Sequence, residues 1–156
     1  MSHQSTTRVP VDDAYAALVG KAVYIFSYYE WTIIWIIESL QNGFVEKYSR
    51  EQTMTSGAVL KALQKLIDDP AMAHPKATKA QIQACCDEFD ELVVKRNALI
   101  HAHPCTDSDG SQILIYQTQI TKPLPDMMWP KCEVEALISE FDEAACNAGR
   151  LLDTLR

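Results

Sequence analysis

The sequence has few of the features that mark secreted, membrane-anchored or strongly basic proteins. It has 14 Lys and Arg residues against 21 Asp and Glu residues, and the net charge of −7 argues against non-specific attraction to a polyanion. Any contact with nucleic acid is therefore expected to be local. The five cysteines are odd in number and two of them are adjacent, unlike a secreted disulfide framework, so we expect a reducing cytoplasm.

Long apolar runs and motifs for cofactors are also missing. Residues 1–10 contain no apolar stretch of the kind that a signal peptide needs. The most apolar segment, residues 22–37, is shorter than a membrane-spanning helix and contains Glu30, so we expect no contact with a membrane. The sequence has no glycine-rich phosphate loop and no carboxylate motif typical of metal sites. We therefore expect neither a cofactor nor a metal.

Length and composition predict one domain over residues 1–156. A chain of 156 residues with 47% hydrophobic and 22% charged residues is long enough to bury a core without disulfides or metals. Residues 1–10 are polar and are expected to form a flexible N-terminus. No repeat or inter-domain linker interrupts the rest.

Apolar residues at helical spacing predict two helices in the first half. The first is expected over residues 12–41, because proline is absent and Asn42-Gly43 then favours a left-handed stop. The second is expected over residues 56–67, before Asp68-Asp69-Pro70. The middle of the first helix is apolar almost all round its axis, so neighbouring helices or a second subunit must cover it.

The second half predicts two more helices separated by an insertion. The third helix is expected from Thr78, which with Gln81 fits a capping box, until His103-Pro104 ends it. Residues 104–129 are expected to hold a turn at 107–110, a short strand around Ile113 and Ile115, and a proline-bracketed loop.

A final helix is expected after Pro130, because apolar residues recur from Val134 to Leu152. The predicted fold is therefore all-α. It is an antiparallel four-helix bundle with a small β-hairpin or extended insertion between the third and fourth helices.

The third helix places an arginine among apolar residues. Arg96 falls in the same inward-facing stripe as Phe89 and Val93. A buried arginine is costly unless it pairs with a carboxylate or lines a polar cleft, and Glu30, on an apolar face of the first helix, is the obvious partner. The pair can be a structural ion pair, or Glu30 can orient Arg96 within a functional site.

Asn97 and His101 lie on one edge of the same helix, four residues apart. His101 stands where the helix must end before Pro104, so it is expected to be partly exposed. A histidine at this position is often only a favourable partner of the helix dipole.

The segment Lys95-Arg96-Asn97-Ala98-Leu99-Ile100-His101 resembles the element of HEPN domains in which an arginine and a polar residue precede a histidine. In that family four or more residues separate the arginine from the histidine, and asparagine commonly follows the arginine. The first helix is also similar to family members, with an aromatic-rich run at residues 24–35 that contains Glu30. The helix order extends the resemblance over nearly the whole chain.

The resemblance implies an all-α bundle, a homodimer with two such elements facing a shared cleft, and metal-independent cleavage of RNA. His101 would move a proton at the ribose 2′-hydroxyl or the leaving 5′-oxygen, and Arg96 would neutralise the phosphorus centre. Asn97 would bind a phosphate oxygen or fix the imidazole tautomer. The product would be a cyclic phosphate, and the protein a toxin or phage-defence effector held in check by an antitoxin or regulatory protein.

Further residues are assigned to this expected site in supporting roles. Glu30 and His103 are expected to support catalysis, and Tyr28 and Lys95 to contact the substrate. Arg96 and His101 lie roughly 140° apart around the helix axis, so a symmetric dimer would be needed to bring both to one phosphate.

Three other interpretations stay open. The chain can be a non-catalytic module of the same fold that binds a protein or a nucleotide. His103, Cys105 and Cys132 can form a zinc site, although their spacing is not a common zinc signature. The aromatic residues of the first helix can stack on bases, but at helical spacing they favour a core or an interface.

Overall fold

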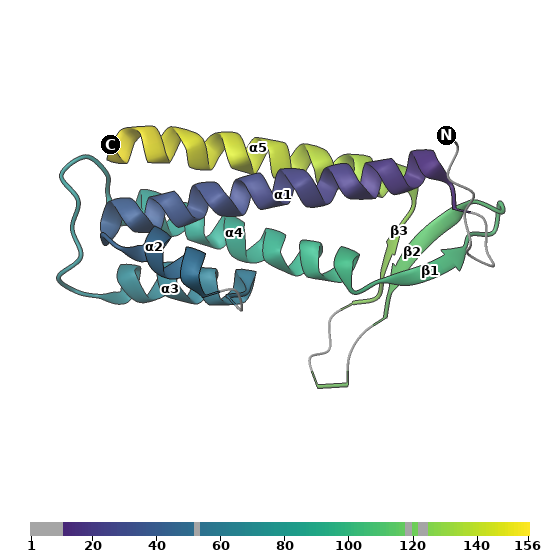
Figure 1. Ribbon diagram of the computed structural model, residues 1–156, viewed down its shortest axis with the longest axis horizontal. Helices are drawn as coiled ribbons and strands as arrows, with labels where there is room; N and C mark the ends of the chain where they lie inside the picture. Colours follow the sequence, from purple (N-terminus) through teal and green to yellow (C-terminus); the bar gives the residue numbers. More distant parts are fainter. Residues whose placement is uncertain (1–10, 52–53, 118–119, 122–124) are drawn as a thin grey trace.

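The computed structural model describes residues 11–51, 54–117, 120–121 and 125–156. The N-terminal segment 1–10, expected to be flexible, lies outside these residues. The described residues form five helices and a small sheet (Figure 1). In chain order the elements are α1 (Asp13–Leu40), α2 (Phe44–Arg50), α3 (Ser56–Asp68), α4 (Lys79–Ile100), β1 (His103–Thr106), β2 (Gln112–Tyr116), β3 (Met127–Trp129) and α5 (Lys131–Leu155).

Local capping explains where the long helices begin and end. The Asp12 carboxylate accepts a hydrogen bond of 3.0 Å from the Tyr15 N–H, and Thr78 and Gln81 form the predicted capping box at the start of α4. Gly43, with φ of 95°, turns the chain after α1. The four predicted helices and the mainly helical fold are therefore confirmed. None of the helices in the described part of the chain is long and apolar enough to cross a membrane.

α1 and α5 lie side by side and run in the same direction (Figure 1). The Tyr15 hydroxyl, near the start of α1, donates to the carbonyl of Trp129, just before α5. At the other end the Arg156 guanidinium lies 5.6 Å from the centre of the Trp35 ring. The predicted antiparallel arrangement is therefore wrong for this pair.

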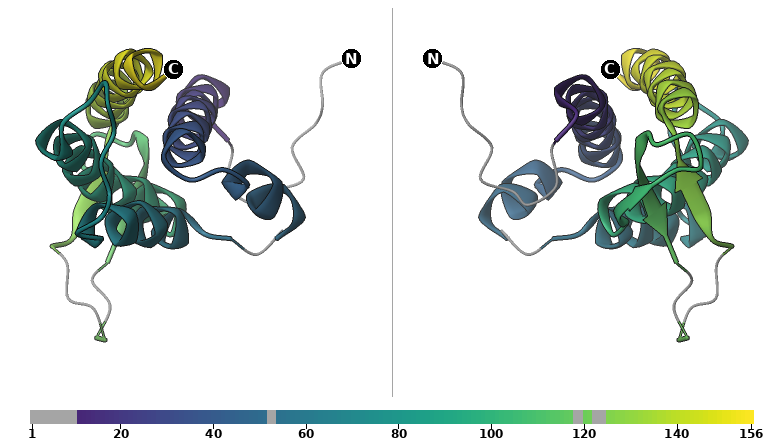
Figure 2. Two further views of the ribbon diagram at one scale, coloured as in Figure 1. Left: turned by 90° about the vertical axis from the view of Figure 1, so that its left-hand side faces the viewer. Right: turned by 90° about the vertical axis from the view of Figure 1, so that its right-hand side faces the viewer.

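The cause is α2, a short helix that the sequence analysis missed. The Glu38 carboxylate, near the end of α1, accepts hydrogen bonds from the N–H groups of Gly43 and Val45, which also lowers the pKa of Glu38. The Tyr48 hydroxyl of α2 donates to Glu30 in the middle of α1, so α2 runs back along α1. The chain therefore changes direction once more than predicted before α3. Figure 2 shows α1 between α5 and α2. α4 runs antiparallel to α1, since Phe89 contacts Tyr29 while Arg96 lies over Phe26.

The insertion is an antiparallel sheet with strand order β1-β2-β3. In its register His103 lies opposite Ile115, and Ile115 lies opposite Met128. The predicted turn between β1 and β2 is confirmed, with φ of 86° at Gly110. β3 falls in the segment predicted as a loop, so that prediction is wrong. The prolines at positions 125 and 130 favour a loop, but the three residues of β3 between them form a strand. This strand pairs with β2 because Tyr116 and Trp129 are buried against the helices.

Four aromatic rings form the centre of the core between α1, α4 and α5. Phe26 lies 5.1 Å from Phe141 and 6.1 Å from Phe89, and Tyr29 lies 5.4 Å from Phe89, measured between ring centres. All four side chains are at most 1% exposed. Cys85 and Cys86 are also buried, and burial raises the pKa of the Cys85 thiol to about 12.

The core contains one unpaired polar group that can be tested by substitution. The Tyr29 hydroxyl is buried without a hydrogen-bond partner in the described structure, and burial raises its pKa. Because such a group is costly to bury, Tyr29→Phe should raise the free energy of unfolding by about 1 kcal/mol at pH 7 in urea titrations.

The same variant should respond less to alkaline pH. Above the ordinary tyrosine pKa of about 10, the unfolded chain loses a proton that folded Tyr29 keeps, so wild-type stability falls by up to about 1.4 kcal/mol per pH unit from this residue. Tyr29→Phe lacks this contribution. Lower stability of the variant at pH 7 would show that the hydroxyl has a partner.

Candidate active site

Arg96 lies in the last part of α4, between the core and the surface. Its side chain is half-buried, and its guanidinium carbon lies 5.4 Å from the centre of the Phe26 ring on α1. Its Nη1 donates a hydrogen bond of 2.9 Å to Oδ1 of Asn97. The inward orientation predicted for Arg96 is therefore observed. The guanidinium and the Asn97 amide form one hydrogen-bonded unit.

Glu30 lies one helical turn from Phe26, and its carboxylate is only partly satisfied. Oε1 accepts a long hydrogen bond of 3.4 Å from the Tyr48 hydroxyl, and Oε2 is buried without a partner in the described structure. None of the ion pairs among the described residues joins Glu30 to Arg96. The predicted pair is therefore not formed. Arg96 is instead held by the Phe26 ring and by Asn97.

Tyr48 is the site residue that the sequence analysis missed. It comes from α2, and its ring centre lies 6.1 Å from that of Trp31 on α1. Burial raises the pKa of Tyr48, the negative charge of Glu30 adds to the rise, and the positive charge of Arg96 opposes it. Tyr48 thus responds to both charged residues. Apolar residues at positions 44, 45 and 48 gave a weak helical signal that could have located it.

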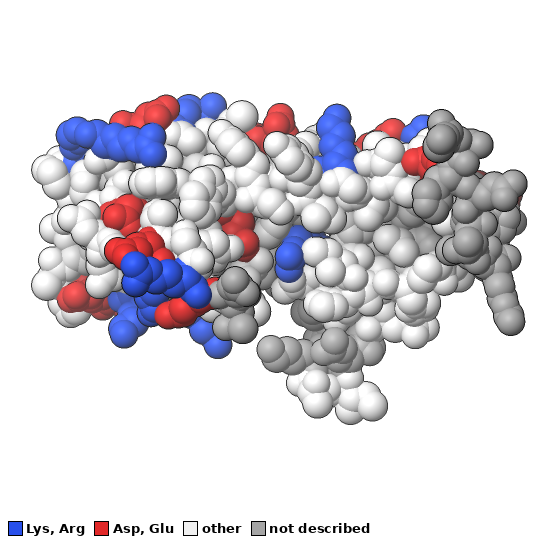
Figure 3. All heavy atoms as spheres, in the orientation of Figure 1, with Lys and Arg blue, Asp and Glu red and all other residues white. Residues whose placement is uncertain are grey.

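A row of aromatic side chains stands exposed on the face of α1 that turns away from the core, and Trp31 of this row contacts Tyr48. Tyr24, Tyr28 and Trp31 are 78%, 63% and 40% exposed, and their spacing of four and three residues places them on one face of the helix. Tyr29, by contrast, is in the core. Figure 3 shows few charged groups over the middle of this face of the molecule. The row is therefore a surface that can contact bases or another protein.

The two histidines lie beyond the end of α4. His101 is exposed, and its backbone N–H donates to the Asn97 carbonyl at 2.9 Å. His103 is exposed on β1. No hydrogen bond joins the side chains of Arg96 and His101 in the described part of the chain. One protomer thus presents the two groups separately, as their 140° offset around the helix predicts.

Lys95 lies away from this group. Its amine pairs with the Glu140 carboxylate of α5, and the two line a pocket with β3. The structure therefore brings together Arg96, Asn97, Glu30 and Tyr48, and it does not place Lys95 with them.

The residues of the possible zinc site are spread over two elements. His103 and Cys105 are exposed on β1, and Cys132 is exposed on α5. Within the described residues, no three His, Cys, Asp or Glu side chains gather as a metal site would require. The geometry therefore gives the zinc interpretation no support.

No protein-family model matches the chain, and no curated protein and no solved structure shows significant similarity to it.

The contact between Tyr48 and Glu30 can be tested by removing one hydroxyl. Tyr48→Phe keeps the ring against Trp31 but removes the one donor to Glu30 Oε1, so neither oxygen of the carboxylate then has a hydrogen-bond partner in the described structure. We expect the free energy of unfolding to fall by about 0.5–1.5 kcal/mol, measured in urea at pH 7. Tyr28→Phe, which removes a hydroxyl from an exposed ring of the same surface, should change it by less than about 0.5 kcal/mol. Equal effects of the two substitutions would contradict the contact.

Proposed function

We propose that the protein is a HEPN-like, metal-independent endoribonuclease centred on Arg96, Asn97 and His101. The observation that carries the proposal is the Arg96–Asn97 unit, which is half-buried over Phe26, with His101 exposed just beyond it. An arginine held by an amide and an aromatic ring is oriented before any substrate binds, which favours binding of a phosphate.

The proposed reaction is attack by a ribose 2′-hydroxyl on the adjacent phosphorus. A neutral His101 imidazole accepts the 2′-hydroxyl proton as the new oxygen–phosphorus bond forms. The bond from phosphorus to the 5′-oxygen breaks, and that oxygen takes up a proton from an imidazolium or from water. The products are a 2′,3′-cyclic phosphate and a 5′-hydroxyl end. Arg96 stabilises the charge on the phosphorus oxygens, and Asn97 holds Arg96 or a phosphate oxygen.

The separation of Arg96 from His101 on one helix supports a homodimer as the active form. Two copies related by a two-fold axis can place the arginine of one beside the histidine of the other. The exposed row on α1 offers an apolar surface for that contact. In this proposal α1, α3, α4 and α5 correspond to the four helices of the HEPN bundle, and Glu30 and His103 support the catalytic residues.

RNA binding would be local, as the net charge of −7 requires. Tyr28, 63% exposed on α1, is proposed to stack on a base of the bound RNA. A nuclease with this chemistry would need restraint inside a cell. We therefore propose a toxin or phage-defence effector of the cytoplasm, controlled by an antitoxin or another regulatory protein.

The deciding experiment is cleavage of mixed cellular RNA in the presence of EDTA. Wild type should cut, and His101→Ala should lose roughly 100-fold or more of the rate, the usual contribution of a general acid or base. His74→Ala, in the loop before α4, is the matched control and should keep full activity. Circular dichroism must show that every variant is folded.

A second experiment tests the composite site of the dimer. Arg96→Ala and His101→Ala should each be inactive alone, and a mixture that exchanges subunits should regain part of the activity. In a mixed dimer one chain supplies Arg96 and the other supplies His101. Mixed dimers that form in sedimentation experiments but stay inactive would show that both residues must come from one chain.

The second candidate is a non-catalytic module that binds a protein or a nucleotide through the same surface. The exposed row of Tyr24, Tyr28 and Trp31 favours it, because so many aromatic rings on one exposed helix face are typical of a binding surface. RNA that stays intact with folded wild-type protein at every stoichiometry would favour this candidate.

A further inference from the structure

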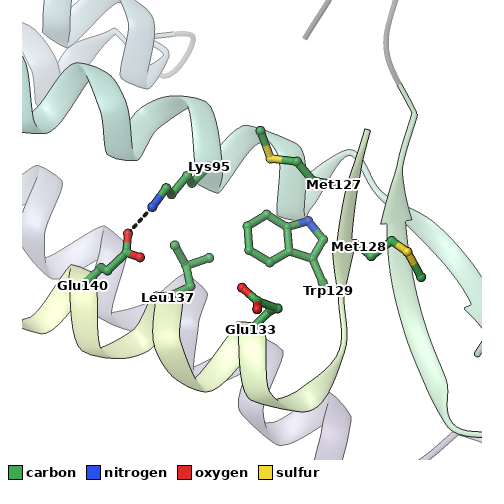
Figure 4. A pocket seen from close by; sticks show the side chains of 7 residues that line it. All are labelled: Lys95, Met127, Met128, Trp129, Glu133, Leu137 and Glu140. Carbon is green, nitrogen blue, oxygen red and sulfur yellow. Dashed lines mark hydrogen bonds and ion pairs between the residues drawn. The ribbon is translucent and has the colours of Figure 1, made fainter. Parts of the chain in front are cut away.

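A second feature lies on another side of α4 from the proposed active site. Lys95 precedes Arg96, so the two side chains leave the helix about 100° apart. Lys95 faces a cavity of about 240 Å³ between α4, β3 and α5 (Figure 4). Nothing in the proposed reaction uses this cavity.

The walls of the cavity combine negative charge, apolar surface and an unpaired donor. Glu140 pairs with Lys95, whereas Glu133 takes part in none of the ion pairs among the described residues, so the cavity keeps one uncompensated carboxylate. Leu137 and the Trp129 ring supply the apolar surface. Trp129 is 5% exposed, and its Nε1–H is buried without a hydrogen-bond partner in the described structure. Such a wall suits a cationic group on an apolar stem.

The cavity opens beside the outer edge of the sheet. β3 is the last strand in the order β1-β2-β3. Figure 4 shows Met127 and Trp129 on the side of β3 that faces α4 and α5, and Met128 on the other side. Through the Tyr15 hydroxyl, the Trp129 carbonyl is linked to the Leu114 N–H of β2. Since backbone groups alternate along a strand, the N–H and carbonyl of Met128 face away from β2.

We infer that this edge binds an extended, basic segment of a partner protein. The segment pairs with Met128 as a fourth strand, and the side chains on either side of the paired residue turn toward the helices. A Lys or Arg at such a position places its stem against Leu137 and Trp129 and its charge beside Glu133.

The negative charge of Glu133 favours a basic segment over a second copy of the chain and over RNA. The edge strands of a second copy, β1 and β3, bring no Lys or Arg to the Glu133 carboxylate, which repels negatively charged groups. RNA phosphates are repelled for the same reason. The inference does not depend on the proposed nuclease activity, because none of the residues that carry it takes part in that reaction.

The probe is a fluorescein-labelled pentapeptide in which three Val alternate with two Lys, titrated with the full chain and followed by fluorescence anisotropy. We expect saturable binding that Glu133→Gln weakens by roughly two- to fivefold, as for one exposed ion pair. Glu135→Gln, an exposed residue of the same helix outside the cavity, is the matched control and should leave binding unchanged. A peptide with Glu in place of Lys should not bind.

A backbone readout separates strand pairing from simple charge attraction. Hydrogen exchange of the Met128 amide should slow when the Lys peptide binds, and methylating the central peptide nitrogen should remove both the protection and most of the affinity. The inference is overturned if the peptide does not bind saturably, if both Gln variants weaken it equally, or if the Met128 amide is unaffected. Protection that rises with protein concentration alone would assign the edge to a second copy and would also overturn it.

Discussion

The packing of α1 against α4 and α5 is the contact on which the rest of the structure depends. Phe26 and Tyr29 of α1 meet Phe89 of α4 and Phe141 of α5, and each such ring pair adds about 0.5–1.5 kcal/mol beyond its buried area. This cluster fixes the rotation of α1. Because one face of α1 packs in the core, Tyr24 and Tyr28 on the opposite face point outward and are exposed. The sequence of α1 is apolar almost all round the helix axis and had predicted that other helices or a second subunit cover several of its sides.

The candidate site is a consequence of the same packing. Phe26 belongs to the core on one side and supports the Arg96 guanidinium on the other, so the position of the arginine is tied to the position of the rings. Glu30 follows Phe26 by one turn and therefore lies near the same group. α2 then folds back so that Tyr48 reaches Glu30 and rests against Trp31. The chain thus assembles its polar group from α1, α2 and α4 without an ion pair between Glu30 and Arg96.

The sequence predicts the parts of this arrangement that depend on local chemistry. The capping box at Thr78, the helix ends and the inward position of Arg96 follow from spacing and side-chain type alone. It does not predict the α1–α5 orientation, because one short helix changes the direction of every later element. Nor does it predict β3, whose three residues pair only because tertiary contacts bury Trp129. The prediction of a Glu30–Arg96 ion pair was wrong for a similar reason. Two residues on the apolar faces of packed helices lie near each other, but this placement does not decide which neighbours their side chains contact.

The distribution of charge gives the two faces of α4 different chemistry. On one side the Arg96 guanidinium lies over the Phe26 ring and forms no ion pair with Glu30 among the described residues, so its positive charge stays available to an anion on an acidic protein. On the other side Lys95 is neutralised by Glu140, and Glu133 leaves an excess of negative charge. Because exposed charges act over about 8 Å at physiological salt, each face is governed by its own residues rather than by the net charge. The proposed anionic substrate and the inferred basic segment would therefore meet different surfaces of the same helix.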